Sequence, residues 1–218
     1  MKAPENKAKM LSFPELFPEL PAKVDIPGEN SYNSEKKEVS SMKAYIPPQR
    51  RSLSADPRYK DAMIFGCMEL AGRSGHEAGR TLLQGLWEQH IGGALPEIAL
   101  TDRGKPFFPE SPWHFSISHT KKRVFCVLSR ENVAIDAEET DRNIHPALAE
   151  KILSPGEKAR FDAAEDRRAA LLRFWVLKEA AAKLSGQGLR GYPNHTDFSP
   201  DDPRVFESNG CFVAILKE

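Results

Sequence analysis

The pattern of apolar and polar residues changes near residue 50. Residues 1–50 are rich in Pro, Lys, Glu and Ser, and their one apolar cluster is Phe13–Leu20. Closely spaced prolines prevent a long helix or a central strand, because proline lacks the backbone N–H and has a restricted φ. We therefore expect residues 1–50 to form an extended N-terminal arm.

Beyond this arm, apolar residues recur at helical spacing. They do so through Ala62–Phe65 and again through Leu82–Trp87, with the breaker sequence Gly-Arg-Ser-Gly at 72–75 between them. This spacing predicts two helices, or one bent helix, ending near Gly92-Gly93. A loop interrupted by prolines follows, from Gly104 to Pro112.

The second half of the chain has clearer strand patterns. Phe115–Ser118 alternates between apolar and polar residues, and Val124–Ser129 and Val133–Glu138 are mainly apolar runs. Arg130–Asn132 joins the last two runs, so we predict a hairpin with Asn in the turn. Cys211–Leu216 is expected to form a final buried strand.

Two helices are expected between these strands. Ser154-Pro-Gly-Glu157 supplies an N-cap, a proline at the first helical position and a capping box. A longer helix is predicted from about Asp166 to Leu184, ending at a glycine C-cap in Ser185-Gly186. The expected fold class is therefore α+β, sandwich-like, with mainly antiparallel pairing.

Composition narrows the possible partners. The chain has 218 residues, enough for one large domain or two small ones, and its 31 basic and 31 acidic residues cancel. A net charge of zero provides no global attraction for nucleic acid or membrane, so we expect neither as a partner. The three cysteines are sparse and lack metal-type spacing, and no apolar leader or membrane-spanning run is seen. These features predict reduced thiols in the cytoplasm, with Cys126 in the core.

Candidate chemistry lies in two stretches. In a strand, Asp136 and Glu138 would share one face because side chains alternate sides. In a helix, Glu179 and Lys183 would stand one turn apart. Acids in apolar sequence are costly unless they are neutralised, so these residues predict a magnesium-dependent phosphate site. The alternatives are a solvated edge strand for the first pair and an exposed i,i+4 ion pair for the second.

Several motifs in this chain occur in an order typical of one enzyme family. The chain resembles the 4′-phosphopantetheinyl transferases, in particular their larger, surfactin-synthetase-activating class, over roughly residues 75–190. Five stretches carry the resemblance: Glu77–Leu83, Gly104-Lys-Pro106, Phe115–His119, Ile135-Asp-Ala-Glu138, and Trp175-x-x-Lys-Glu-Ala-x-x-Lys183 with Gly186-x-Gly-Leu189.

The resemblance implies a defined reaction. Such enzymes move 4′-phosphopantetheine from coenzyme A (CoA) to a serine of an acyl or peptidyl carrier protein, and they release 3′,5′-ADP. Charge develops on the pyrophosphate, so Mg²⁺ and cationic side chains are expected to offset it. The implied fold has two pseudo-duplicated halves, at 51–130 and 131–218, which form a monomer with CoA in the cleft between them.

The resemblance also implies roles for single residues. Asp136, Glu138 and Glu179 match the metal ligands of the second half, and Lys183 matches a catalytic contact to the pyrophosphate. Either Glu179 or a metal-bound hydroxide would take the serine proton, and the sequence does not choose between them. Trp175 is expected to serve packing.

The first half would hold the nucleotide. Arg80, Thr81 and His119 match positions that contact the CoA 3′-phosphate, and Ser118 is grouped with them as a CoA contact. Lys105 matches a contact to the adenine or ribose. Two other functions stay open: a non-catalytic module that binds CoA and carrier proteins, and a metal-dependent nuclease. The zero net charge disfavours the nuclease.

Overall fold

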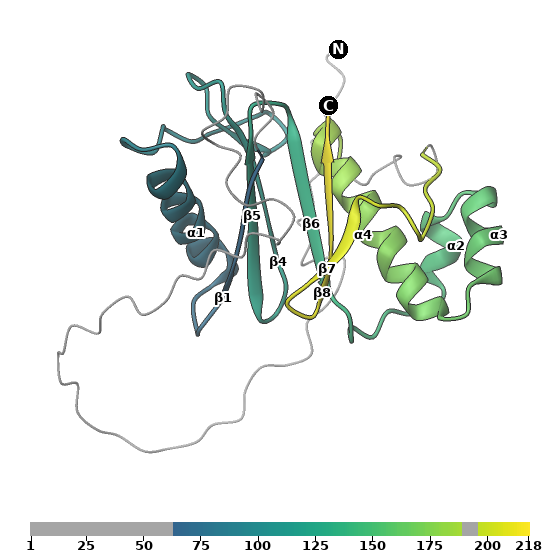
Figure 1. Ribbon diagram of the computed structural model, residues 1–218. Coiled ribbons are helices and arrows are strands. Elements are labelled where there is room, and N and C mark those ends of the chain that lie inside the picture. Colours follow the sequence, from purple (N-terminus) through teal and green to yellow (C-terminus); the bar gives the residue numbers. More distant parts are fainter. Residues whose placement is uncertain (1–62, 189–195) are drawn as a thin grey trace, which may run out of the picture. The chain divides into compact units, whose positions relative to one another are not determined.

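The computed structural model describes residues 63–188 and 196–218, all within one of the two units into which the chain divides, Ser41–Glu218. The expected arm over residues 1–50 and the motif residue Leu189 lie outside the described residues. The expected α+β class with antiparallel sheets is confirmed (Figure 1). No helix in these two described stretches is both long and apolar enough to cross a bilayer.

The same topology occurs twice. Each copy has a strand, a long helix and then a hairpin whose last strand enters the centre of a three-stranded antiparallel sheet. In the first copy the sheet order is β1-β5-β4, from β1 (Ile64–Glu69), α1 (Gly75–His90), β4 (His114–His119) and β5 (Arg123–Ser129). In the second copy the order is β6-β8-β7, from β6 (Val133–Glu139), α4 (Arg167–Ser185), β7 (Val205–Ser208) and β8 (Cys211–Lys217).

Shorter elements are inserted into each copy. The proline-interrupted segment of the first contains a two-stranded ladder of β2 (Ala99–Leu100) and β3 (Pro106–Phe107). The second contains α2 (Leu148–Ile152) and α3 (Pro155–Ala163), which pack with α4. The expected capping box at the start of α3 is confirmed, and α4 ends at Gly186 in the left-handed region.

The two sheets pack face to face between the long helices (Figure 1). One core lies between α1 and the first sheet, a second lies between the sheets, and a third lies around α4. Along β6, Val133, Ile135 and Ala137 belong to the core between the sheets. Because strand side chains alternate, Asp136 and Glu138 lie on the other face, toward α4. The predicted shared face of these two acids is confirmed by their contacts with α4.

The predicted helix through Phe65 is wrong. Ile64–Glu69 is β1, which pairs antiparallel with β5, with Ile64 opposite Leu128. Four consecutive residues, Ile64–Cys67, are buried because helix α1 covers one face and the second sheet covers the other. A strand covered on both faces loses its polar alternation, so its apolar run is easily read as helix. The helix predicted through Leu82–Trp87 is confirmed within α1.

The predicted hairpin between Val124–Ser129 and Val133–Glu138 is also wrong. β5 is the centre of the first sheet, where β1 and β4 already occupy its two edges. β6 instead pairs with β8 in the second sheet. Residues 130–132 therefore carry the chain from one sheet to the other, and β7, which we did not predict, forms the hairpin with β8. All three cysteines are buried and free, as expected for Cys126.

Candidate active site

A seam of serine hydroxyl groups joins the two sheets beside the predicted site. β4 is an edge strand of the first sheet and β6 is an edge strand of the second. Ser116 Oγ accepts a hydrogen bond from Ile135 N (3.1 Å), and Ser118 Oγ accepts one from Ala137 N (3.2 Å). Both strands advance by two residues between these bonds, so β4 and β6 run parallel along the seam. The hydroxyls thus satisfy backbone N–H groups that an ordinary ladder would pair.

Asp136 projects from β6 toward α4 and has two donors on one oxygen. Ser118 Oγ donates to Asp136 Oδ1 at 2.9 Å, and Lys183 Nζ donates to the same atom at 2.6 Å. Lys183 Nζ also donates to the Ile135 carbonyl at 3.1 Å. Lys183 therefore connects the end of α4 to β6 through both a carboxylate and a backbone group.

Glu138 has an equivalent pair of partners, one neutral and one cationic. The indole Nε1 of Trp175 donates to Glu138 Oε1 at 3.2 Å, and the guanidinium of Arg142 forms an ion pair with the same oxygen. Trp175 is buried, so the expected packing role is correct but incomplete. The missed signal was its spacing, because Trp175, Glu179 and Lys183 are four residues apart and share one face of α4.

Glu179 lies on this face of α4, and one of its oxygens is unsatisfied by the described residues. Its buried Oε1 has no hydrogen-bond partner among the described residues. Burial, and then repulsion from Asp136, raises the pKa of Glu179 to about 7, although Lys183 and Arg142 oppose the shift. A carboxylate left this way stabilises any cation that approaches it.

The three acids fit a hard cation by their chemistry. Mg²⁺ prefers carboxylate oxygens, and Glu179 presents a buried one that no described residue pairs. Within residues 63–188 and 196–218, however, no cluster of three or more His, Cys, Asp or Glu side chains is close enough to hold a metal. Lys183 and Arg142 supply positive charge to Asp136 and Glu138 in this arrangement. The metal role of the three acids stays a prediction.

The predicted nucleotide contacts lie around the first part of α1. Arg80 and Thr81 are exposed, and Thr81 Oγ1 donates to the Glu77 carbonyl at 2.9 Å. His119 ends β4 beside Gly75, the first residue of α1. A Cβ added at Gly75 would lie 2.5 Å from His119 Cγ, so any larger residue would push the imidazole out of this position. The structure therefore brings His119 to the start of the helix that carries the other two residues.

Lys105 joins the two copies of the topology. Its ammonium donates to Asn132 Oδ1 and to the Leu184 carbonyl, both at 3.0 Å. Partial burial lowers the pKa of Lys105. The Leu184 carbonyl is one of the last in α4, where unpaired carbonyl groups favour a cation. Lys105 thus holds the end of the helix that carries Glu179, and its nucleotide contact stays a prediction.

Lys178 belongs to the same motif but faces a different part of α4. Its side chain and that of Glu157 are both 0% exposed, and Nζ lies 2.6 Å from Glu157 Oε2. Lys178 Nζ also donates to the Thr196 carbonyl, and Glu157 Oε1 accepts from Phe198 N. This buried ion pair connects α4 with α3 and with the segment before β7. It lies next to Glu179 in the sequence of α4.

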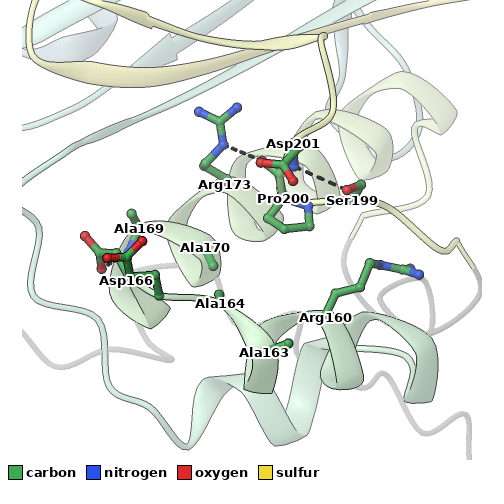
Figure 2. A pocket seen from close by; sticks show the side chains of 11 residues that line it. Arg160, Ala163, Ala164, Asp166, Ala169, Ala170, Arg173, Ser199, Pro200 and Asp201 are labelled. Atoms are coloured by element: carbon green, nitrogen blue, oxygen red, sulfur yellow. Dashed lines mark hydrogen bonds between the residues drawn. The ribbon is translucent and has the colours of Figure 1, made fainter.

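A pocket of about 440 Å³ lies elsewhere, at the junction of α3 and α4. Figure 2 shows alanines on its wall and Arg173 reaching the backbone of Pro200. Arg160, on the α3 side, is bound to the Phe198 carbonyl and Asp197. None of the residues predicted for the metal, CoA or catalysis lines this pocket.

Comparison with known proteins bears on this site. The family model described as the 4′-phosphopantetheinyl transferase superfamily matches residues 132–209, which include β6 and α4 with all three acids and Lys183. The resemblance to this family is confirmed.

Individual relatives carry the same name. The chain is 37% identical over 118 residues to the 4′-phosphopantetheinyl transferase AcpT of Escherichia coli K12, covering 50% of this chain and 56% of that protein. It is 32% identical over 117 residues to a putative 4′-phosphopantetheinyl transferase of Haemophilus influenzae, covering 51% and 49%. It is 32% identical over 89 residues to the 4′-phosphopantetheinyl transferase Sfp of Bacillus subtilis 168, covering 39% of each chain. The chain thus spans about half the length, or less, of the curated relatives it matches.

Proposed function

We propose that this protein transfers 4′-phosphopantetheine from CoA to a serine of an acyl or peptidyl carrier protein, with Mg²⁺, and releases 3′,5′-ADP. The observation that carries the proposal is the alignment of Asp136 and Glu138 on β6 with Glu179 and Lys183 on α4. These elements lie inside the segment that matches the transferase superfamily. Carboxylates that face one another across a strand and a helix, with a lysine beside them, are suited to a reaction at a pyrophosphate.

In this proposal, Asp136, Glu138 and Glu179 hold Mg²⁺, which neutralises charge that develops on the pyrophosphate. Lys183 adds a second positive charge beside Asp136, and a third of its side chain is exposed, so it can reach a substrate oxygen. Glu179 is the acceptor we propose for the serine proton. Its buried Oε1 has no hydrogen-bond partner among the described residues, so this oxygen is available to accept a proton.

The other end of CoA would bind at α1. Arg80 and Thr81 are exposed on this helix, and His119 lies against its first residue, Gly75. Arginine offers paired N–H donors for a phosphate, and the threonine hydroxyl and imidazole add donors. We assign these three residues to the 3′-phosphate, which is the group that distinguishes CoA from dephospho-CoA.

The test is a transfer reaction followed by intact mass spectrometry. The full chain is incubated with CoA, Mg²⁺ and several apo carrier proteins, and each carrier is examined for the phosphopantetheine increment. Glu179→Gln should abolish the increment and keep the melting curve of a folded protein. CoA binding without any increment would favour the non-catalytic module, and cleavage of DNA or RNA without any increment would favour the nuclease.

A further inference from the structure

We propose that Ser118 is a positioning residue that holds Asp136 ready for the metal, and that its hydroxyl does not contact CoA. This inference rests on the proposed function, and it revises the role that the family resemblance implies for Ser118. It follows from how the hydroxyl hydrogen and lone pairs of this buried residue are already used.

The hydroxyl of Ser118 has one hydrogen, which it donates to Asp136 Oδ1 at 2.9 Å. The oxygen also accepts a hydrogen bond from Ala137 N at 3.2 Å. Ser118 is only 6% exposed, so neither bond is easily exchanged for water. A phosphate oxygen accepts hydrogen bonds, so it would have to compete with Asp136 for the single proton.

The two donors on Asp136 differ in charge, and this difference decides what happens when a cation binds. Lys183 Nζ lies 2.6 Å from Asp136 Oδ1, so its ammonium group repels a metal ion that approaches this carboxylate. To bind Asp136, the metal ion must displace the ammonium group or share the carboxylate with it. The Ser118 hydroxyl is neutral and therefore leaves the full negative charge on Asp136. It fixes the orientation of the carboxylate without competing with the metal.

Ser116 provides a matched control on the same strand. It is 8% exposed and accepts a hydrogen bond from Ile135 N at 3.1 Å, two residues before the Ser118 contact. In the described part of the chain, no carboxylate accepts from its hydroxyl. Replacing either serine with alanine leaves one β6 N–H without its partner, but only the change at Ser118 also removes a donor from Asp136.

The experiment measures Mn²⁺ binding by electron paramagnetic resonance, together with the Mg²⁺ and CoA dependence of transfer, on the full chain. Ser118→Ala should weaken Mn²⁺ binding by about 10- to 100-fold, the usual effect of losing a group that orients a metal ligand. The KM for CoA at saturating Mg²⁺ should stay unchanged. Ser116→Ala should leave Mn²⁺ binding near the wild-type value, and Ser118→Thr, which keeps a hydroxyl, should restore most of it.

Three results would overturn the inference. The first is a raised KM for CoA in Ser118→Ala with unchanged Mn²⁺ binding, which would make the hydroxyl a CoA contact. The second is equal weakening of Mn²⁺ binding in both alanine variants, which would make the seam merely structural. If Ser118→Ala does not fold, Ser118→Cys replaces the hydroxyl with a thiol, which is only a weak hydrogen-bond donor. Wild-type Mn²⁺ binding in Ser118→Cys would be the third such result. Wild-type protein that neither binds Mn²⁺ nor transfers would instead refute the proposed function.

Discussion

The indole Nε1 of Trp175 donates a hydrogen bond to Glu138 Oε1 at 3.2 Å, linking α4 to β6. Glu179 and Lys183 follow Trp175 at successive i+4 positions on the same face of the helix. Glu138 thus receives a neutral donor from α4, as Asp136 receives one from Ser118 on β4. Each strand carboxylate is held by a group that does not cancel its charge.

Trp175→Phe tests this arrangement. Phenylalanine keeps the aromatic packing and removes the donor, so Glu138 loses one of the two partners it has among the described residues. We expect the Mg²⁺ concentration for half-maximal transfer to rise about 10-fold, with a much smaller change at saturating Mg²⁺. Trp87→Phe is the control, because Trp87 Nε1 is buried without a partner in the described part of the chain. Equal Mg²⁺ dependence in the two variants would contradict the proposed role of Trp175.

The raised pKa of Glu179 predicts a pH-dependent stability without divalent cations. The pKa of Glu179 is about 7 in the folded state and near 4.5 in the unfolded chain, so the folded state binds the proton more tightly. The contribution of Glu179 to the free energy of unfolding is therefore greatest below about pH 4.5. It declines by roughly 3 kcal/mol in total as the pH rises toward 7. Thermal unfolding of the wild type and of Glu179→Gln between pH 5 and pH 8, in about 1 mM EDTA, measures this decline in stability. The glutamine variant should lack this part of the slope, and identical slopes would refute the assignment.

Gly75→Ala tests the position of His119. The added Cβ would lie 2.5 Å from the imidazole, so the ring must move away from the start of α1. We expect the KM for CoA to rise about 10-fold, comparable to the loss of one charge-assisted hydrogen bond. The KM for 3′-dephospho-CoA should change little.

Gly79→Ala is the matched helix control for this experiment. Its added Cβ would meet Ile117 Cγ2 at 3.0 Å, and none of the nearest atoms belongs to His119. Both variants should lose some packing stability, but only Gly75→Ala should discriminate between the two nucleotides. A similar rise in KM for both nucleotides in Gly75→Ala would show that His119 does not read the 3′-phosphate.

The buried ion pair between Lys178 and Glu157 predicts a large stability effect. Lys178→Met would leave an unpaired carboxylate at a site that is 0% exposed, which costs about 3–5 kcal/mol. Lys158→Met breaks the exposed pair with Glu150 and should cost less than about 1 kcal/mol. Urea unfolding of both variants provides the comparison. Equal losses in the two variants would contradict the burial argument.

Local signals predicted the elements whose cues lie within a few residues. The capping box at Ser154 starts α3, and Gly186 ends α4, because both motifs pair backbone groups of adjacent turns. The alternation of strand side chains was also enough to put Asp136 and Glu138 on one face. The i,i+4 rule did the same for Glu179 and Lys183 on α4.

Signals that depend on distant partners were missed or misread. β1 looks helical in sequence because α1 covers one of its faces and the second sheet covers the other. Residues 130–132 look like a hairpin turn, but β5 already has two neighbours and β6 pairs with β8. In both cases the deciding contacts come from segments far along the chain.

The candidate site divides in the same way. The sequence alone determined which acids and which lysine stand together on β6 and on α4, because strand and helix periodicity are local properties. Only the tertiary structure decided that Ser118 and Trp175 orient the two strand carboxylates and that Lys105 holds the end of α4. The tertiary structure also buries one oxygen of Glu179 that has no hydrogen-bond partner among the described residues. Those features arise where two sheets and a helix meet, and burial and hydrogen bonding there depend on packing that no single stretch of sequence contains.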